Sequence, residues 1–461
     1  MGLRPLGASR VARRRRLCVL FAALASSAAC TGPRLDARYR ELRDESSRAA
    51  APLPLREDAL AFERAPALER GVLVREVLRR NPTLAAARAA VQEALARYPQ
   101  DTSLDDPMLG YAIGPRSFGT SAVDDAHRVE LSQALLWPGK RRLRGASALA
   151  LAEAAGGDFA ALRLELALQA SRLLDDYWAA TRALEINAQH LELLDELQTI
   201  ALARYEVGEA SQQDPLQAET ELAGLLHVEV QIRSELRMVQ QRLNALLHRD
   251  PDAELPPPPA RLELPAPVGD AEAHLAAALR ERPELRAAQQ RVAAREASLA
   301  LAQREFLPDF ALVGGWDGFW QEKELQTFVG LEVNVPLRLA RRRGAVEEAK
   351  AALARSRSER DRVEDEIRLA VRSAAVRLGE AHHLFAIVQD RRLPASRDRV
   401  AAARAGFETG RDDFLALIEA ERSLRDAELA LDEARADVSR RFAELEAAAG
   451  RTPGLAEGEQ P

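Results

Sequence analysis

The sequence predicts a mainly helical fold of long antiparallel helices, to which two β-hairpins are added. Charged residues make up 30% of the 461 residues and aromatic residues only 5%, which is typical of long helices rich in Ala, Leu, Glu and Arg. Long stretches have apolar residues three or four positions apart, and short segments between them alternate apolar and polar residues. The net charge of −6, with mixed signs, argues against a nucleic-acid partner.

Residues 1–29 have the pattern of an export signal. Four arginines at 13–16 supply positive charge, and the apolar residues 17–29 are too few to span a bilayer as a permanent helix. The chain later has no run of 18 or more uncharged apolar residues, so no transmembrane helix is expected. Its two cysteines, Cys18 and Cys30, exclude a disulfide framework in the body of the protein.

The end of this signal allows two interpretations. One is an ordinary signal peptide cut after Ala28 or Ala29. The other is a bacterial lipoprotein signal in which Cys30 becomes the lipidated first residue, although Ser27 occupies a position where Leu or a similar residue is usual. By analogy with lipoprotein sorting, Thr31 in place of Asp after the cysteine favours the outer membrane over the inner one.

The chain repeats itself after about 200 residues, which predicts a duplicated half rather than a short-period solenoid. The Pro-rich segment ELPPPPARLELPAPVG at 254–269 separates the halves and predicts an extended linker. The matching segments are 81–91 with 282–292, 129–145 with 329–344, and 205–222 with 407–424. The expected organisation is a signal at 1–29, an extended lipid-anchored segment at 30–70, a first repeat at 71–253, a linker at 254–270, a second repeat at 271–449 and a flexible tail at 450–461.

Each half is expected to contain two long helices. The first half has them at about 140–205 and 215–247, and the second at about 341–407 and 413–448. The first of these would be a rod of roughly 100 Å. Pro394 predicts a kink in the third, and the pair Gly156-Gly157 is a candidate weak point in the first. Periodicity alone would favour a plain coiled-coil rod with solvated charged faces.

The segments between the helices alternate with a period of two, which predicts one hairpin per half with strands of about 10–12 residues. Residues 116–125 and 321–324 are the turn-prone connections. Trp137, Trp316 and Trp320 lie in or at the ends of these strands, as in the aromatic girdles of membrane barrels. The expected strand segments are 108–114, 129–137, 309–320 and 325–337.

A four-stranded sheet with an apolar outer face has two possible settings. A small soluble β-domain that caps a coiled coil would leave edges and apolar surface exposed. In a membrane, all edges must be paired, so four strands cannot close a barrel. Three chains would supply 12 strands and 12 long helices, enough for a trimeric β-barrel continued by a hollow α-barrel.

At this point the sequence resembles the TolC-type outer-membrane efflux channels over nearly all of the mature chain. The resemblance rests on NPTL and RPEL at two helix starts, on WPGKR at 137–141, on NVPLRLARRRGAVEEAKAAL at 334–353, and on the two helix-to-helix segments 205–219 and 407–421. With Cys30, it is similar to the lipoprotein members that serve RND-type pumps, including heavy-metal exporters. It implies a homotrimer in the outer membrane with helices in the periplasm, docked onto a periplasmic adaptor and an inner-membrane RND-type transporter.

The resemblance also implies roles for residues at the periplasmic tips. Gly208 and Gly410 suit tight helix-to-helix turns and are candidate adaptor contacts. Acidic residues beyond these glycines narrow the entrance in the family; the four matching positions here are Asp214, Gln217, Ala416 and Glu419. Asp214 and Glu419 would form a ring of six carboxylates in a trimer, or they are solvated acids at helix starts.

One departure concerns a tip lock that some relatives have, formed by an Arg two residues after the second glycine and a Tyr three residues before it. Asp412 and Phe407 occupy those positions here, so that lock is not expected. Asp412 and Asp413 are instead expected to cap the following helix.

Three function classes compete on this sequence. A passive efflux duct for heavy-metal cations or drugs is favoured, and a non-pore periplasmic coiled-coil lipoprotein with a structural or adaptor role is the alternative. An enzyme is not supported, because no catalytic or nucleotide-binding motif is present. No cofactor or bound metal is expected either, and the pair His382-His383 is interpreted as solvated surface.

Overall fold

The computed structural model describes residues 32–49, 62, 65–119, 126–267, 269–320, 322–409, 411 and 413–455. The chain divides into two compact units. The sheet unit comprises the described parts of residues 1–51, 88–157 and 286–362. The helical unit comprises the described parts of 52–87, 158–285 and 363–461.

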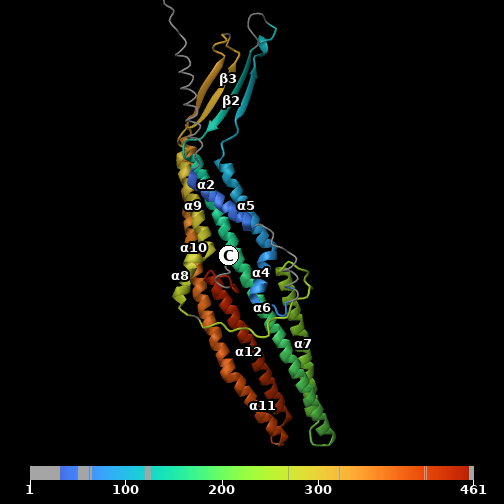
Figure 1. Ribbon diagram of the computed structural model, residues 1–461. Helices are drawn as coiled ribbons and strands as arrows, with labels where there is room; N and C mark the ends of the chain where they lie inside the picture. Colours follow the sequence, from blue (N-terminus) through green and yellow to red (C-terminus); the bar gives the residue numbers. More distant parts are fainter. Residues whose placement is uncertain are drawn as a thin grey trace, which may run out of the picture. The chain divides into compact units, whose positions relative to one another are not determined.

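The sheet unit contains four antiparallel strands in sequential order (Figure 1). The predicted strand positions are confirmed, but the strands are shorter than the expected 10–12 residues. Pro115 begins a 3₁₀ turn, η1 (Pro115–Ser117), which ends the first strand, and Pro336 lacks the N–H that would extend the last. The strands are β1 (Met108–Ile113), β2 (His127–Leu135), β3 (Asp309–Asp317) and β4 (Thr327–Asn334).

Long helices make up most of the rest of the chain (Figure 1). The predicted helix from residue 140 is confirmed as α6 (Lys140–Glu206), which runs through Gly156 and Gly157 without a break. In the helical unit, α6 turns back into α7 (Gln213–Leu246), and α11 (Leu393–Glu408) turns back into α12 (Phe414–Ala448). The remaining helices are α4 (Arg70–Arg80), α5 (Pro82–Thr102), α8 (Ala271–Glu281), α9 (Pro283–Arg304) and α10 (Leu339–Ile387).

The core of the helical unit repeats the sequence duplication. In one cluster Leu73 of α4, Leu174 of α6 and Leu243 of α7 pack together, all fully buried. The counterpart in the second half joins α8, α10 and α12 through side chains such as Ile367 and Val438. A third cluster combines both halves, because α6, α7, α11 and α12 all contribute to it.

A π-helical turn, η2 (Val388–Arg392), separates α10 from α11. Pro394 is the second residue of α11, so the irregularity that this proline predicts lies directly before it. Pro394 cannot donate the backbone hydrogen bond that continues an α-helix, so an irregular turn is readily accommodated here.

Two terminal expectations need correction. Residues 33–49, expected to be extended, form helix α2 (Pro33–Ala49), which has Pro at its first position and Asp36 in its first turn. Residues 450–455, expected in a flexible tail, pack against the helical unit, with Leu455 in the core cluster of α4, α6 and α7. The linker at 254–267 has no regular helix or strand, as expected.

Candidate functional site

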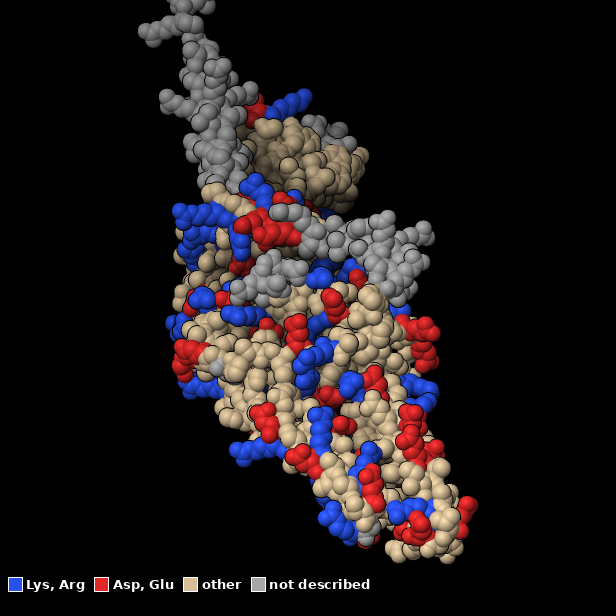
Figure 2. All heavy atoms as spheres, turned by 60° about the horizontal axis from the view of Figure 1, so that its bottom comes forward, with Lys and Arg blue, Asp and Glu red and all other residues tan. Residues whose placement is uncertain are grey.

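The sheet has one continuous apolar face. The strand register aligns the alternation of all four strands, so that Tyr111 pairs with Val129, Leu131 with Gly314, and Leu312 with Leu331. Most apolar side chains of this face are exposed in the single chain: 53% for Leu131 and 59% for Val329 of β4. The part of the sheet seen in Figure 2 is largely free of charged side chains, whereas both signs are mixed over the helices.

The opposite face of the sheet is polar. Arg128 forms an ion pair with Glu130 (2.9 Å) and stacks over the ring of Phe328 (5.2 Å). Arg128 is also 3.9 Å from Asp317 of β3. An arrangement with apolar residues on one face and paired charges on the other suits a sheet between lipid and a water-filled lumen.

The three tryptophans mark both ends of the sheet. Trp137 follows β2 and stacks on Phe310 at the start of β3. Trp316 and Trp320 lie at the other end, exposed by 38% and 56%, and Trp316 donates its indole N–H to Gln326 (3.1 Å). Their positions at opposite strand ends are compatible with two girdles, which remain a prediction.

The junction between β2 and α6 is built around a buried lysine. Lys140 is only 1% exposed, and its ammonium group donates to Asp309 (2.9 Å), to Glu305 (3.4 Å) and to the Leu307 carbonyl (3.2 Å). The junction between β4 and α10 contacts the same segment, because Arg342 donates to the Glu305 carbonyl (2.6 Å). The motif WPGKR was recognised from the sequence, but this role of its lysine was not.

The turn between α6 and α7 requires its glycine. Gly208 has φ +78°, its N–H bonds to the Tyr205 carbonyl (3.0 Å), and the N–H of Glu209 bonds to the Arg204 carbonyl (2.8 Å). This is a Schellman C-cap, in which the left-handed residue is usually glycine. Gly208 is therefore the left-handed residue that ends α6 at this turn.

The second turn shows the same closing hydrogen bond. The N–H of Arg411 bonds to the Gly406 carbonyl (2.9 Å), five residues back, as Glu209 does to Arg204. Asp413 caps α12 by accepting from the N–H of Ala416 (2.9 Å), as expected. Gly410 and Asp412 lie outside the described residues, as does Cys30.

Glu419 does not stand alone near the second turn. Its carboxylate is 3.4 Å from Arg422, and Arg422 also forms an ion pair with Glu221 of α7. Sequence reasoning missed Arg422. Its spacing from Glu419 was a weak signal for an i,i+3 pair, but the contact with α7 had none.

Asp214 is half-buried in the first turn of α7, and its N–H bonds to the Ser211 carbonyl (3.1 Å). Within the described residues of one chain, no hydrogen bond joins Asp214 to Glu419.

Phe407 holds α11 against both α12 and α6. Its ring centre lies 5.6 Å from that of Phe414 and 4.6 Å from the guanidinium carbon of Arg204.

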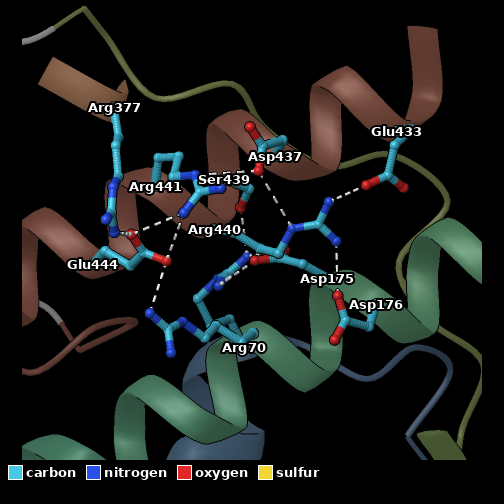
Figure 3. Close-up of polar contacts among 11 residues, drawn as sticks. Arg70, Asp175, Asp176, Arg377, Glu433, Asp437, Ser439, Arg440, Arg441 and Glu444 are labelled. Carbon is cyan, nitrogen blue, oxygen red and sulfur yellow. Dashed lines mark hydrogen bonds and ion pairs between the residues drawn. The ribbon is translucent and has the colours of Figure 1, made fainter. Parts of the chain in front are cut away.

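A buried polar network ties α4, α6 and α12 together (Figure 3). Asp175 of α6 is fully buried and accepts two hydrogen bonds from Arg70 of α4 (2.5 and 3.3 Å), while Arg70 also donates to Ser439 (2.7 Å). Burial raises the pKa of Asp175, and the Arg70 guanidinium opposes this rise. Beside them, Arg440 pairs with Asp176 and Glu433.

Two features of the described residues bear on function. Among the residues that the structure describes, no three His, Cys, Asp or Glu side chains come together as a metal site. No helix in that part of the chain is both long and apolar enough to cross a membrane.

Residues 275–451 match the family described as "Outer membrane efflux protein". A comparison with curated proteins gave no match.

Solved structures match the fold over most of the chain. The outer membrane protein VceC from Vibrio cholerae matches with a TM-score of 0.72 and 18% identity over 85% of this chain and 98% of that one. The outer-membrane channel OprN matches with a TM-score of 0.67 and 25% identity, over 87% and 94%. The open state of the Neisseria gonorrhoeae MtrE outer membrane channel matches with a TM-score of 0.68 and 18% identity, over 83% and 89%. The expected fold class, long helices of an α-barrel with hairpins of a β-barrel, is confirmed.

Proposed function

Because the chain belongs to the TolC-type outer-membrane efflux channels, which are passive conduits rather than enzymes, we propose that three copies form the export duct of a tripartite efflux system. A periplasmic adaptor and an inner-membrane RND-type transporter deliver the substrate to the helical tips, and the transporter supplies the energy. The cargo is a heavy-metal cation or a drug, and the acids at the tips favour a positively charged one.

The observation that carries this proposal is the open, amphipathic sheet. Strands β1 and β4 each have one edge without a partner among the described residues of the chain. In a bilayer, unpaired backbone groups are costly, so both edges must meet other copies. Three copies give 12 strands with the apolar face toward lipid, and the face with Arg128 and Glu130 lines the lumen.

The helices also carry apolar surface that a single chain leaves uncovered. On α7, Leu226 and Val230 are exposed by 53% and 68% and lie one turn apart. On α10, Leu369 and Val376 are exposed by 68% and 71%, a heptad apart. Such stripes are suited to burial between neighbouring copies in a ring of helices.

Lipidation of Cys30 belongs to the same proposal. Gly32, two residues later, lies next to the side chain of Arg142 at the β2–α6 junction. Helix α2 is held there, because Tyr98 donates to Asp36 (2.6 Å) and Arg38 pairs with Glu153 (2.7 Å). A lipid on Cys30 would thus enter the membrane beside the base of the sheet.

The test uses two neighbouring residues on opposite faces of β2. The wild-type protein, solubilised from outer membranes in detergent, should migrate as a heat-modifiable trimer and conduct ions in planar bilayers. Leu131→Arg, on the apolar face, should abolish the trimer, because arginine facing lipid costs about 2–4 kcal/mol per chain. Ser132→Arg, on the polar face, should insert normally and change only conductance. A soluble periplasmic monomer without conductance would instead support the non-pore lipoprotein.

A further inference from the structure

The two strand-to-helix junctions carry only positive charge. Residues 138–152 contain Lys140, Arg141, Arg142 and Arg144 and no acid, and residues 335–346 contain four arginines and no acid. The whole chain has a net charge of −6, so this concentration of positive charge is confined to the two junctions. The two segments are repeat equivalents, and both contact the stretch from Glu305 to Asp309, so they lie side by side in the sheet unit.

Some of these cations have internal partners. Lys140 binds Asp309, Arg141 donates to the Thr102 carbonyl (2.9 Å), and Arg342 donates to the Glu305 carbonyl. Others do not: Arg142, Arg338, Arg341 and Arg343 are exposed, and no carboxylate pairs with them within the described residues. We call these four residues the basic collar.

The collar adjoins the apolar face of the sheet. Leu337 is 81% exposed and Leu339 46%, so exposed leucines alternate with the collar arginines directly after β4. Val335, 61% exposed, continues the apolar side of that strand toward them. Cations with apolar stems beside exposed leucines are the arrangement expected where a membrane's hydrocarbon region meets its headgroups.

The start of the described chain gives a second, independent observation beside the collar. Gly32, two residues after the candidate lipidation site, lies against Arg142 of the collar. A lipid on Cys30 would therefore lie close to the basic collar.

We propose that the basic collar binds the phosphate groups of anionic phospholipids in the periplasmic leaflet, a proposal that rests on the membrane placement proposed above. The planar guanidinium fork of arginine matches phosphate oxygens and can bind two at once. The neighbouring leucines lie among the upper parts of the acyl chains. The collar fixes the depth at which the barrel sits, and it gives the protein a preference for acidic lipid.

The test measures lipid binding to the full-length protein in a non-ionic detergent. Dioctanoyl-phosphatidylglycerol should bind more tightly than dioctanoyl-phosphatidylcholine, and 300 mM salt should weaken this binding by screening. Arg338→Gln/Arg341→Gln/Arg343→Gln should weaken phosphatidylglycerol binding roughly tenfold or more. Arg391→Gln/Arg392→Gln/Arg399→Gln removes the same charge from exposed positions elsewhere and should bind as wild type.

Three results would overturn the proposal. One is wild-type protein without a preference for phosphatidylglycerol, a result that does not depend on the folding of any variant. Another is unchanged phosphatidylglycerol binding by the variant with all three substitutions, at Arg338, Arg341 and Arg343. The third is competition by inorganic phosphate that displaces phosphatidylglycerol as strongly as the lipid itself does, which would indicate a site for free anions. Lipid binding in detergent needs no open pore, so the two proposals can fail separately. A preference for acidic lipid without conductance would contradict only the export duct. Conductance without that preference would contradict only lipid binding by the basic collar.

Discussion

The ammonium nitrogen of Lys140 lies 2.9 Å from a carboxylate oxygen of Asp309 and joins the first residue of α6 to the first residue of β3. Lys140 is almost fully buried, so this carboxylate and that of Glu305 replace water in stabilising its positive charge. The pair fixes the point at which a strand becomes a helix.

Removal of the carboxylate should therefore weaken the junction. Asp309→Asn leaves the buried ammonium with the more distant Glu305 carboxylate and the Leu307 carbonyl, and we expect a loss of about 3 kcal/mol, because a poorly paired buried charge is costly. The measurement is the temperature at which the trimer dissociates. As a control, Asp317→Asn affects a looser pair, with Arg128 at 3.9 Å, and should cost under about 1 kcal/mol. Equal losses in the two variants would contradict this account of Lys140.

The acids at the tips should control conduction. Asp214→Ala combined with Glu419→Ala should raise single-channel conductance in planar bilayers and lower cation preference, because fewer like charges then crowd the entrance. Glu219→Ala removes an exposed acid of α7 and serves as the charge control. Unchanged conductance and selectivity in the double variant would remove the ring hypothesis and leave the channel intact.

The turn at Gly208 should not tolerate a side chain. Gly208→Ala forces a residue with a Cβ to adopt φ +78°, at a cost of about 1–2 kcal/mol. Hydrogen exchange at the end of α6 and the start of α7 should speed up. Gly224→Ala, within α7 and with open space around its Cβ, should instead slow exchange, since alanine favours helix. Equal effects at both positions would argue against a strained turn.

The stability of the helical unit should depend on pH through Glu446. Burial raises the pKa of Glu446 to about 7, opposed by the charges of Arg70 and Arg451. Between pH 4.5 and about 7, the folded chain therefore holds a proton on Glu446 that the unfolded chain has released. The stability that the protonated carboxyl contributes is complete below pH 4.5 and is lost as the pH rises to about 7.

Glu446→Gln should therefore be more stable than wild type at pH 8, by about 1–2 kcal/mol, and equal to it near pH 4. Thermal unfolding followed by circular dichroism checks this, with the exposed Glu196→Gln as the control. A gain at pH 4 as large as that at pH 8 would show that the effect is not titration.

Cys30 should carry the lipid. Labelled palmitate should be incorporated into wild-type protein and not into Cys30→Ser, whereas Cys18→Ser should label normally because it lies in the apolar part of the signal. Labelling that persists in Cys30→Ser would refute the anchor and would leave the duct proposal in place.

The sequence predicted elements that depend on local periodicity. The alternation around Leu131 and Leu331 assigned the apolar face, and the absence of proline after Pro138 predicted the whole of α6. The pattern did not reveal α2, because residues 33–49 are few and strongly polar.

The side-chain partnerships of the site were beyond sequence reasoning. Lys140 and Asp309 are 169 residues apart, and Arg422 and Glu221 are 201 apart. Such pairs follow from how the two halves pack, and neither partner differs in type from dozens of other charged residues. The glycine of the first turn was predictable because a positive φ selects one residue type.

The π-helical turn η2 accommodates one of the residues by which the second copy of the duplicated half is longer than the first. The repeat spacing is 200 residues at residue 129 and 202 at residue 205, so the second copy has gained residues between these points. The inward-facing positions Val371, Leu378 and Phe385 recur every seven residues, and the series resumes at Leu393, after eight. One added residue is thus accommodated as a widened turn, and the helix beyond it keeps the same side toward its neighbours. A deletion of one residue between 388 and 392 should restore an ordinary α-turn without rotating either flanking segment, whereas the same deletion elsewhere in α10 would turn every following side chain by about 100°.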